Sequence, residues 1–226
     1  MAIFVSAGEG SSYTPIEEGT YMALCYGLVD TGDEYSEKFD KCQDRFSILW
    51  ELVGAGTITV DGKEYNRSIS KSYTKSLNAK STLRKDLRAW RGREFTDEEL
   101  KKFNMSNILG APCQIQVINS QSGEKTYSNI AAIMSLPKGM PKPQPTQEMI
   151  HWDFQENTID DDMYKKIPAW LKTKIATSET YQYITKNDVG HLSDKRLEEI
   201  CQYKAFQDWH TKHDFAIIDT DEELPF

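Results

Sequence analysis

The chain has few of the residues that build metal-centred or covalent sites. Four cysteines and four histidines occur among 226 residues, and the cysteines lie far apart with no C-x-x-C pair. This spacing favours reduced, structural thiols over disulfides or zinc. His210 and His213 have ligand-like spacing, but no partner cluster accompanies them, so a surface pair is the better interpretation. We therefore expect no metal and no cofactor.

Long apolar runs and catalytic motifs are also absent. No run approaches the roughly 18 apolar residues of a membrane helix, and no signal peptide opens the chain, so we expect a soluble, cytoplasmic protein without membrane contact. P-loop, G-x-S-x-G and H-E-x-x-H motifs are missing. The acids Asp160, Asp161 and Asp162 point in different directions on any regular backbone, which favours a solvated loop over a metal nuclease. We therefore expect no catalytic residues and no enzyme.

Acidic residues outnumber basic ones, and the net charge is −8, but the basic residues are concentrated. Between Arg67 and Arg93, nine basic residues accompany one acid, Asp86, for a net charge of +8. We call residues 67–93 the basic block. Phosphate binding depends on local charge density, because the Debye length is about 8–10 Å at physiological salt. The basic block therefore predicts a surface for a polyanion.

The first half of the chain alternates between apolar and polar residues, which predicts β-strands. We expect strands over residues 20–29, 45–52, 58–60, 63–65, 68–75, 113–118 and 125–135, with a tight turn at Asp61-Gly62 and a polar loop over 30–41. Alternation places Met22, Leu24, Tyr26 and Leu28 on one face of the first strand. It likewise places Phe46, Ile48, Trp50 and Leu52 on one face of the second.

Two helices are predicted after the strand at 68–75. Ser81 can cap the first and Gly92 can end it, and Thr96-Asp97-Glu98-Glu99 forms a capping box for the second. Three strands, a helical insertion and a closing hairpin give the order of a five-stranded OB-type barrel, whose helix lies between strands 3 and 4. An unrelated five-stranded α+β sheet fits the same pattern. Either way, we expect a mainly β protein.

Prolines at positions 137, 141, 143 and 145 predict a linker after the β-rich part. We therefore divide the chain into a binding domain (1–137), a Pro-rich and acidic linker (138–162), an α-helical extension (163–213) and an acidic tail (214–226). Within the extension, helical patterns run from about Ala169 to Ala176 and onward from Ser193, which is expected to cap the second helix.

Cations and aromatic rings share faces in the basic block. Alternation places Lys71, Tyr73 and Lys75 on one side of a strand, and single-strand binders use such cations for phosphates and such rings for bases. Trp50 and Trp90 lie on apolar stripes and are expected in the core, so Tyr73 is the preferred stacking residue. The predicted residues for single-stranded DNA (ssDNA) are Lys71, Tyr73, Lys75, Lys80, Arg84, Lys85, Arg88, Arg91, Arg93, Lys125 and Tyr127.

The chain ends in acids followed by an apolar tip. From His213 onward there are five acids and no Lys or Arg. Such a peptide can dock Phe226 in a pocket while its carboxylates meet Arg or Lys of a partner. The predicted protein-interaction residues are Asp219, Asp221, Glu222, Glu223, Leu224, Pro225 and Phe226.

This tip resembles that of bacterial and bacteriophage single-stranded DNA-binding proteins, in which acids run into Ile-Pro-Phe or Leu-Pro-Phe. Residues 81–100, Leu109-Gly110-Ala111-Pro112-Cys113 and Ser6-Ala7-Gly8-Glu9-Gly10 are similar to phage- and prophage-encoded members. The resemblance covers about residues 1–137 and the last eight. It implies an OB fold, sequence-independent ssDNA binding, and a tail that recruits replication, recombination and repair proteins, in the bacterial host cytoplasm for a phage protein.

Between Pro137 and Asp219 the chain departs from the bacterial members, because a helical pattern replaces their long Gly/Pro/Gln-rich linker. The expected function is protection of ssDNA in phage DNA replication and recombination, with homo-oligomer formation left open. Two alternatives stay open. One is a protein-interaction adaptor whose OB fold does not bind DNA, and the other is a recombination mediator or annealing protein.

Overall fold

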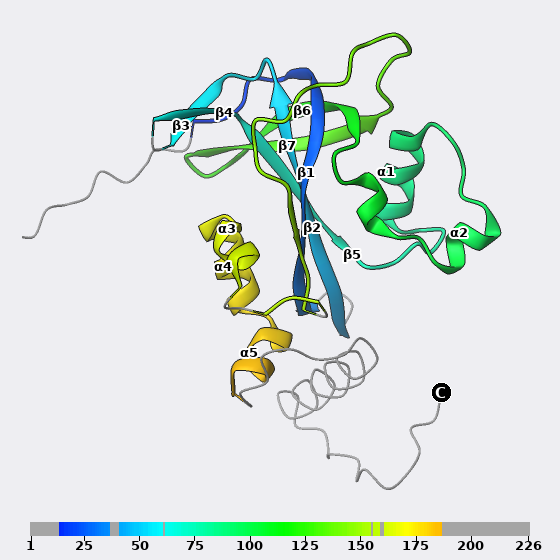
Figure 1. The fold of residues 1–226 in the computed structure, drawn as a ribbon, viewed down its shortest axis with the longest axis vertical. Helices are drawn as coiled ribbons and strands as arrows, with labels where there is room; N and C mark the ends of the chain where they lie inside the picture. Colours follow the sequence, from blue (N-terminus) through cyan, green and yellow to red (C-terminus); the bar gives the residue numbers. More distant parts are fainter. Residues whose placement is uncertain (1–13, 37–40, 61, 155, 159–160, 187–226) are drawn as a thin grey trace, which may run out of the picture.

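Strands make up a larger part of the fold than helices, and most strand pairs are antiparallel (Figure 1). The computed structural model describes residues 14–36, 41–60, 62–154, 156–158 and 161–186. Its strands are β1 (Gly19–Ser36), β2 (Lys41–Val53), β3 (Thr57–Val60), β4 (Lys63–Asn66), β5 (Ser68–Thr74), β6 (Pro112–Ser122), β7 (Lys125–Met134) and β8 (Ile150–Trp152). The main sheet has the order β5-β2-β1-β6-β7, β8 pairs with β1, and β3 and β4 form a separate hairpin. The prediction of a mainly β protein is confirmed.

The main sheet does not close into the predicted barrel. Among the described residues, β5 and β7 end the sheet at opposite sides, and the two strands are not hydrogen-bonded to each other. They approach each other without pairing, because β5 bonds to β2 and β7 bonds to β6. A seam therefore separates the two edges.

The helices are short, and several of them begin at a side-chain cap. They are α1 (Thr82–Arg91), α2 (Asp97–Lys101), the 3₁₀ helix η1 (Met105–Ile108), α3 (Asp162–Lys166), α4 (Ala169–Ala176) and α5 (Glu179–Lys186). Ser81 caps α1, the capping box opens α2, and α4 has the predicted bounds. The pattern beginning at Ser193 lies outside the described residues, and α5 was not predicted. No helix within the described ranges is long and apolar enough to cross a membrane.

The first hairpin is longer than predicted, and the polar loop expected at 30–41 is wrong. β1 continues to Ser36 and β2 begins at Lys41. Bulges lie between Cys25 and Gly27 and between Asp30 and Gly32. Gly32 has a φ of +74°, and a Cβ there would lie 2.7 Å from the Ser178 hydroxyl. Asp30, Thr31 and Asp33 of this stretch belong to the strand and are buried, although their polar character predicts a solvated loop.

One face of the sheet forms a core with α1. The predicted apolar face of β2 packs there against Leu83, Leu87 and Trp90. The predicted apolar face of β1 is wrong, because the bulge after Cys25 changes the alternation. Leu28 therefore joins the same core as Cys25, while Tyr26 lies in the core on the opposite face.

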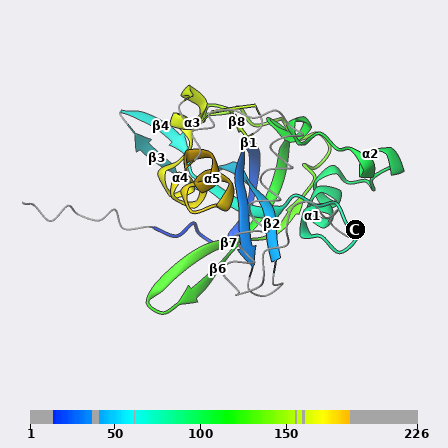
Figure 2. The ribbon, with the colours of Figure 1, turned by 90° about the horizontal axis from the view of Figure 1, so that it is seen from below.

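The opposite face is covered by the C-terminal segment, as Figure 1 and Figure 2 show by placing α1 and α2 on one side of the sheet and α3, α4 and α5 on the other. Leu49 of β2 packs there with Trp152 of β8 and with Leu171 and Ile175 of α4. The segment interpreted as a linker thus contributes a strand, since β8 pairs in parallel with residues 27–29 of β1. The main sheet consequently includes a strand from beyond the proline-rich segment.

A buried carboxylate fixes the proline-rich segment to the sheet. Glu51 of β2 has an exposed fraction of 0 %. Thr146 donates its backbone N–H and, at 2.6 Å, its hydroxyl to the carboxylate of Glu51, and Gln147 donates its backbone N–H. A buried charge needs such donors because desolvation is costly. The 138–149 segment is therefore held in place although it lacks regular structure.

Candidate functional site

Most of the basic block forms ion pairs. The ammonium of Lys71 lies 2.6 Å from Asp86, and that of Lys75 lies 2.7 Å from Asp30 and 2.8 Å from Asp44. The remaining pairs are Arg88 with Glu94, and both Arg91 and Arg93 with Glu99. Five of the nine cations are thus paired, and nine basic groups against these five acids leave a local net charge of +4. The basic block is less available to phosphate than its sequence predicts.

Tyr73 lies in the core rather than on the surface. Its exposed fraction is 3 %, and its ring centroid lies 5.9 Å from that of Phe46. Its hydroxyl donates to Asp86 at 2.9 Å, and burial together with the Asp86 charge raises the pKa of Tyr73. The predicted stacking role needs an exposed ring face, which this position lacks. The prediction that Tyr73 lies on an exposed face of β5 is therefore wrong, because alternation does not say which face of a strand is covered.

Lys75 is held between two carboxylates at one end of the long hairpin. Burial lowers the pKa of Lys75, but the charges of Asp30 and Asp44 outweigh burial and raise it overall. Its side chain is a third exposed, so the ammonium is fixed by the ion pairs rather than by enclosure. A phosphate would have to displace a carboxylate here. Lys75 therefore stabilises the hairpin in this structure.

Arg91 joins α1 to the segment around α2. Its guanidinium lies 4.4 Å from the ring centroid of Phe95 and 5.1 Å from that of Phe103, and its side chain is 13 % exposed. It pairs with Glu99, which also accepts from Arg93 at 2.7 Å. The bonds from Arg93, from the Thr96 backbone and from Arg91 lower the pKa of Glu99 to about 2. Arg91 is therefore a packing residue more than a surface cation.

Four cations of the basic block have no ion pair in the part of the chain that the structure describes. Arg67 donates to the carbonyl oxygen of Pro15 at 3.1 Å, and Arg84 donates to that of Leu77 at 3.4 Å. Carbonyl oxygens carry no net charge, so both guanidinium groups keep a full positive charge. Lys80 and Lys85 are exposed. These four residues retain the electrostatic character that the sequence predicts for the whole block.

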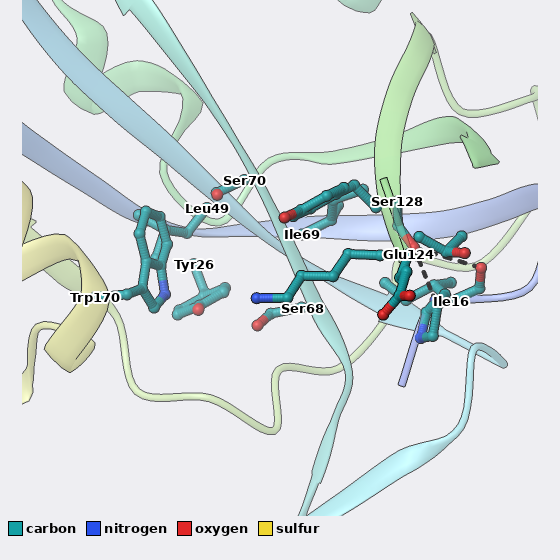
Figure 3. Close-up of a pocket in the computed structure, with 13 residues that line it drawn as sticks. Ile16, Tyr26, Leu49, Ser68, Ile69, Ser70, Glu124, Ser128 and Trp170 are labelled. Carbon is teal, nitrogen blue, oxygen red and sulfur yellow. Dashed lines mark hydrogen bonds between the residues drawn. The ribbon is translucent and has the colours of Figure 1, made fainter. Parts of the chain in front are cut away.

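A groove of about 1020 Å³ follows the seam between β5 and β7 (Figure 3). We call it the seam groove. Lys125 and Tyr127, both predicted for ssDNA, line it from β7, and the exposed fraction of Tyr127 is 46 %. Figure 3 shows Trp170 of α4 on one side, Ile16 and Ser128 on the other, and Ser68 between them. The lining residues are Pro15, Ile16, Tyr26, Leu49, Ser68, Ile69, Ser70, Glu124, Lys125, Thr126, Tyr127, Ser128 and Trp170.

Trp170 is an exposed aromatic residue of the lining that sequence reasoning missed. The sequence holds a signal for it, because Leu171 and Ile175 are four apart and define the buried stripe of α4. Trp170 falls off that stripe and is 53 % exposed. A large ring beside a buried stripe, rather than within it, marks a surface position. The same comparison of stripes identifies it without a structure.

A second hollow, of about 510 Å³, lies beside Lys75 and is lined by Asp30, Lys75, Phe103, His151 and Trp152 among others. Its charged groups are largely engaged with one another, as described for Lys75. Across the described residues, no group of three or more His, Cys, Asp or Glu side chains is arranged to hold a metal.

Two of the cysteines are buried free thiols on adjacent strands. Cys25 lies in β1, and Ala23, two residues before it, pairs with Cys113 of β6. Burial raises the pKa of Cys25 to about 12 and also raises that of Cys113. Both thiols therefore stay protonated and unreactive at neutral pH, in keeping with the structural role predicted for them.

The predicted tail residues, Asp219 to Phe226, lie outside the described residues. The structure thus brings together Lys125, Tyr127 and Trp170 at the seam groove and separates them from the paired cations of the basic block. A scan against protein-family models finds no match for the chain, and a search of curated proteins finds none either.

Proposed function

We propose that the protein binds single-stranded DNA without sequence preference, and that the seam groove is the site. The observation that carries this proposal is the position of Lys125 and Tyr127 side by side along an open groove between two sheet edges. A lysine attracts phosphates, and an exposed ring stacks on any base, because every base has a π-face. Both requirements are met by residues that the sequence alone selects.

The order of the strands supports an OB-type fold. Numbered as OB strands, β1, β2, β5, β6 and β7 are strands 1 to 5, and α1 lies between strands 3 and 4. The OB fold is a five-stranded, partly open barrel, which fits an unpaired seam between β5 and β7. OB proteins bind oligonucleotides near strands 2 and 3 and the loop between strands 4 and 5. The seam groove borders β5 and the β6–β7 turn, because Ser68 and Ser70 line it from β5, Glu124 lies in that turn and Lys125 follows it.

Cations outside the groove provide longer-range attraction. Arg67, Lys80, Arg84 and Lys85 keep their charge, and Lys125 adds one more within the groove. If about four phosphates are neutralised, log K falls with log[salt] at a slope of about −3 for a single strand. The proposed role is protection of ssDNA in replication and recombination, with the acidic tail recruiting partner proteins.

The direct test is the affinity of the full chain for fluorescent dT oligomers at two salt concentrations. Tyr127→Ala should weaken binding by about 1–3 kcal/mol, the contribution of one stacked base, and Tyr127→Phe should retain most of the affinity. Lys125→Ala should also weaken binding, most strongly at low salt. Ile58→Ala is a matched control, because Ile58 is exposed on β3 and does not line the groove. Equal losses in Ile58→Ala and Tyr127→Ala would contradict the site.

A second candidate is a protein-interaction adaptor that does not bind DNA. The ion pairs of the basic block favour it, since they lower the local net charge from the +8 of the sequence to +4. A folded full chain that shows no dT binding at low salt would support the adaptor. Salt-dependent binding would exclude it as the sole function.

A further inference from the structure

We infer that Trp170, on the C-terminal segment, is a base-stacking residue of the seam groove, so that the DNA site is built jointly by the β-rich part and the segment that follows it. The inference rests on the proposed function and adds a residue from a region that the family resemblance does not cover. Trp170 stands on α4, more than 40 residues after β7 starts. Its place in the groove is therefore set by tertiary packing.

Helix α4 is fixed firmly enough to hold a stacking residue. Leu171 and Ile175 are fully buried in the core on the second face of the sheet, together with Tyr26 and Leu49. On the same helix, Lys174 donates to the hydroxyl of Ser72 of β5 at 3.1 Å. Packing and this hydrogen bond join α4 to the edge strand that borders the groove. A ring on a fixed helix loses little conformational entropy when a base stacks on it.

The exposure of Trp170 distinguishes it from the other described tryptophans. Trp50, Trp90 and Trp152 are at most 6 % exposed, whereas Trp170 is 53 % exposed. Trp90 donates its indole N–H to the carbonyl oxygen of Pro112 at 2.9 Å, and Trp152 donates to that of Thr158 at 3.3 Å. These two rings have structural roles. The Trp170 ring instead forms a wall of the groove.

Small hydroxyl groups line the groove together with the two aromatic rings. Ser68 and Ser70 of β5 are in the lining with Trp170 of α4 and Tyr127 of β7, and Figure 3 shows Ser68 between Trp170 and Ile16. Short side chains leave room for a nucleotide chain, and their hydroxyls can donate to phosphate or base oxygens. Rings recognise base faces, which a duplex hides within its stack. The groove therefore suits an unpaired strand.

The test combines affinity with tryptophan emission. Trp170→Ala should lower dT affinity about 5- to 150-fold, the range for losing one stacked base, while Trp170→Phe should retain most of the affinity. Binding of dT should quench the emission of the wild-type chain, and Trp170→Phe should lose most of that quenching. Circular dichroism and the thermal midpoint establish that each variant is folded, and Ile58→Ala serves as the control that should behave as wild type.

The outcomes separate this inference from the proposed function. Wild-type binding that is weakened by Tyr127→Ala but not by Trp170→Ala, with quenching intact in Trp170→Phe, overturns the role of Trp170 and leaves the proposed function standing. A wild-type chain that binds no dT overturns both. If Trp170→Ala does not fold, the quenching in Trp170→Phe decides alone, and retained quenching contradicts the inference.

Discussion

The basic block and the seam groove differ in how many of their binding groups are available to contact DNA. The basic block has nine cations, yet five of them are paired with acids such as Asp86, Asp30 and Glu99. The seam groove contains a single lysine, Lys125, but its Tyr127 and Trp170 rings are half exposed. Charge that is already neutralised contributes little to phosphate binding, whereas an exposed ring is available at once. Unpaired cations and exposed rings therefore predict a binding surface better than the density of charged residues in the sequence does.

The largest effect on the seam groove is expected from a substitution that removes the packing of α4 against the sheet. Leu171→Ala removes a fully buried side chain and should lower the free energy of unfolding by about 2–5 kcal/mol. It should also weaken dT binding, because Trp170 is the preceding residue. Urea unfolding and dT titration measure the two effects. Thr173→Ala, at an exposed position of the same helix, is the control. A Leu171→Ala variant with wild-type stability would show that this core does not hold α4.

The variant Arg91→Ala tests whether this cation of the basic block packs the fold together and does not bind DNA. Arg91→Ala removes the contacts with Phe95 and Phe103 and should cost about 1–3 kcal/mol of stability. Its dT affinity per folded molecule should stay close to wild type. The reverse result, normal stability with weakened binding, would return Arg91 to the DNA site that the sequence predicts.

Two double variants sharpen the distinction between paired and unpaired cations. Lys80→Ala with Lys85→Ala removes two exposed, unpaired charges and should reduce the salt slope by roughly 1.4, at about 0.7 per phosphate contact. Arg88→Ala with Arg93→Ala removes two cations paired with Glu94 and Glu99 and should change the slope by less than half as much. Titrations at four or more salt concentrations give both slopes. Equal changes would mean that the ion pairs open on binding.

The smallest expected effect concerns pH. Hydrogen bonds from Arg93, the Thr96 backbone and Arg91 lower the pKa of Glu99 from 4.5 to about 2. A lowered carboxyl pKa stabilises the folded state fully above the unfolded pKa, and this contribution is lost as the pH falls from about 4.5 toward 2. The thermal midpoints of wild type and Glu99→Gln should therefore converge over that range. A constant difference between them would show that Glu99 is not held as a carboxylate by these bonds.

Local signals predicted local structure well. Ser81 and Thr96 cap their helices because a side-chain oxygen and a backbone N–H three residues later are always within reach. The apolar face of β2 followed from strict alternation. The length of β1 could not be predicted in this way, because Asp30 and Asp33 are residue types typical of a solvated loop but are buried in the structure. Asp30 accepts a hydrogen bond from Lys75, which is 45 residues away, and Asp33 is hydrogen-bonded to Thr180, which is 147 residues away.

The candidate site could also be predicted only in part, because some of its features depend on contacts that are remote in sequence. Lys125 and Tyr127 lie on an outer strand surface, so their alternation was sufficient. The basic block was defined by a window that ended at Arg93, and two of its neutralising acids, Glu94 and Glu99, follow directly. The stacking role predicted for Tyr73 is wrong, because the alternation of residues in β5 does not show which face of the strand is exposed. The second face of this sheet is covered by α4 and β8, which are remote in sequence.

The bonds from Thr146 to Glu51 span 95 residues and have a consequence for synthesis in the cell. A ribosome completes the β-rich part before the residues that cover its second face. At about 5–20 residues per second, the roughly 40 residues from position 137 to Ile175 take about 2–8 s to make. During that interval Leu49 is uncovered, and until Thr146 and Gln147 are made the Glu51 carboxylate lacks its donors as well. The newborn chain therefore passes through a state of a few seconds in which an apolar sheet face is open to aggregation or to a chaperone.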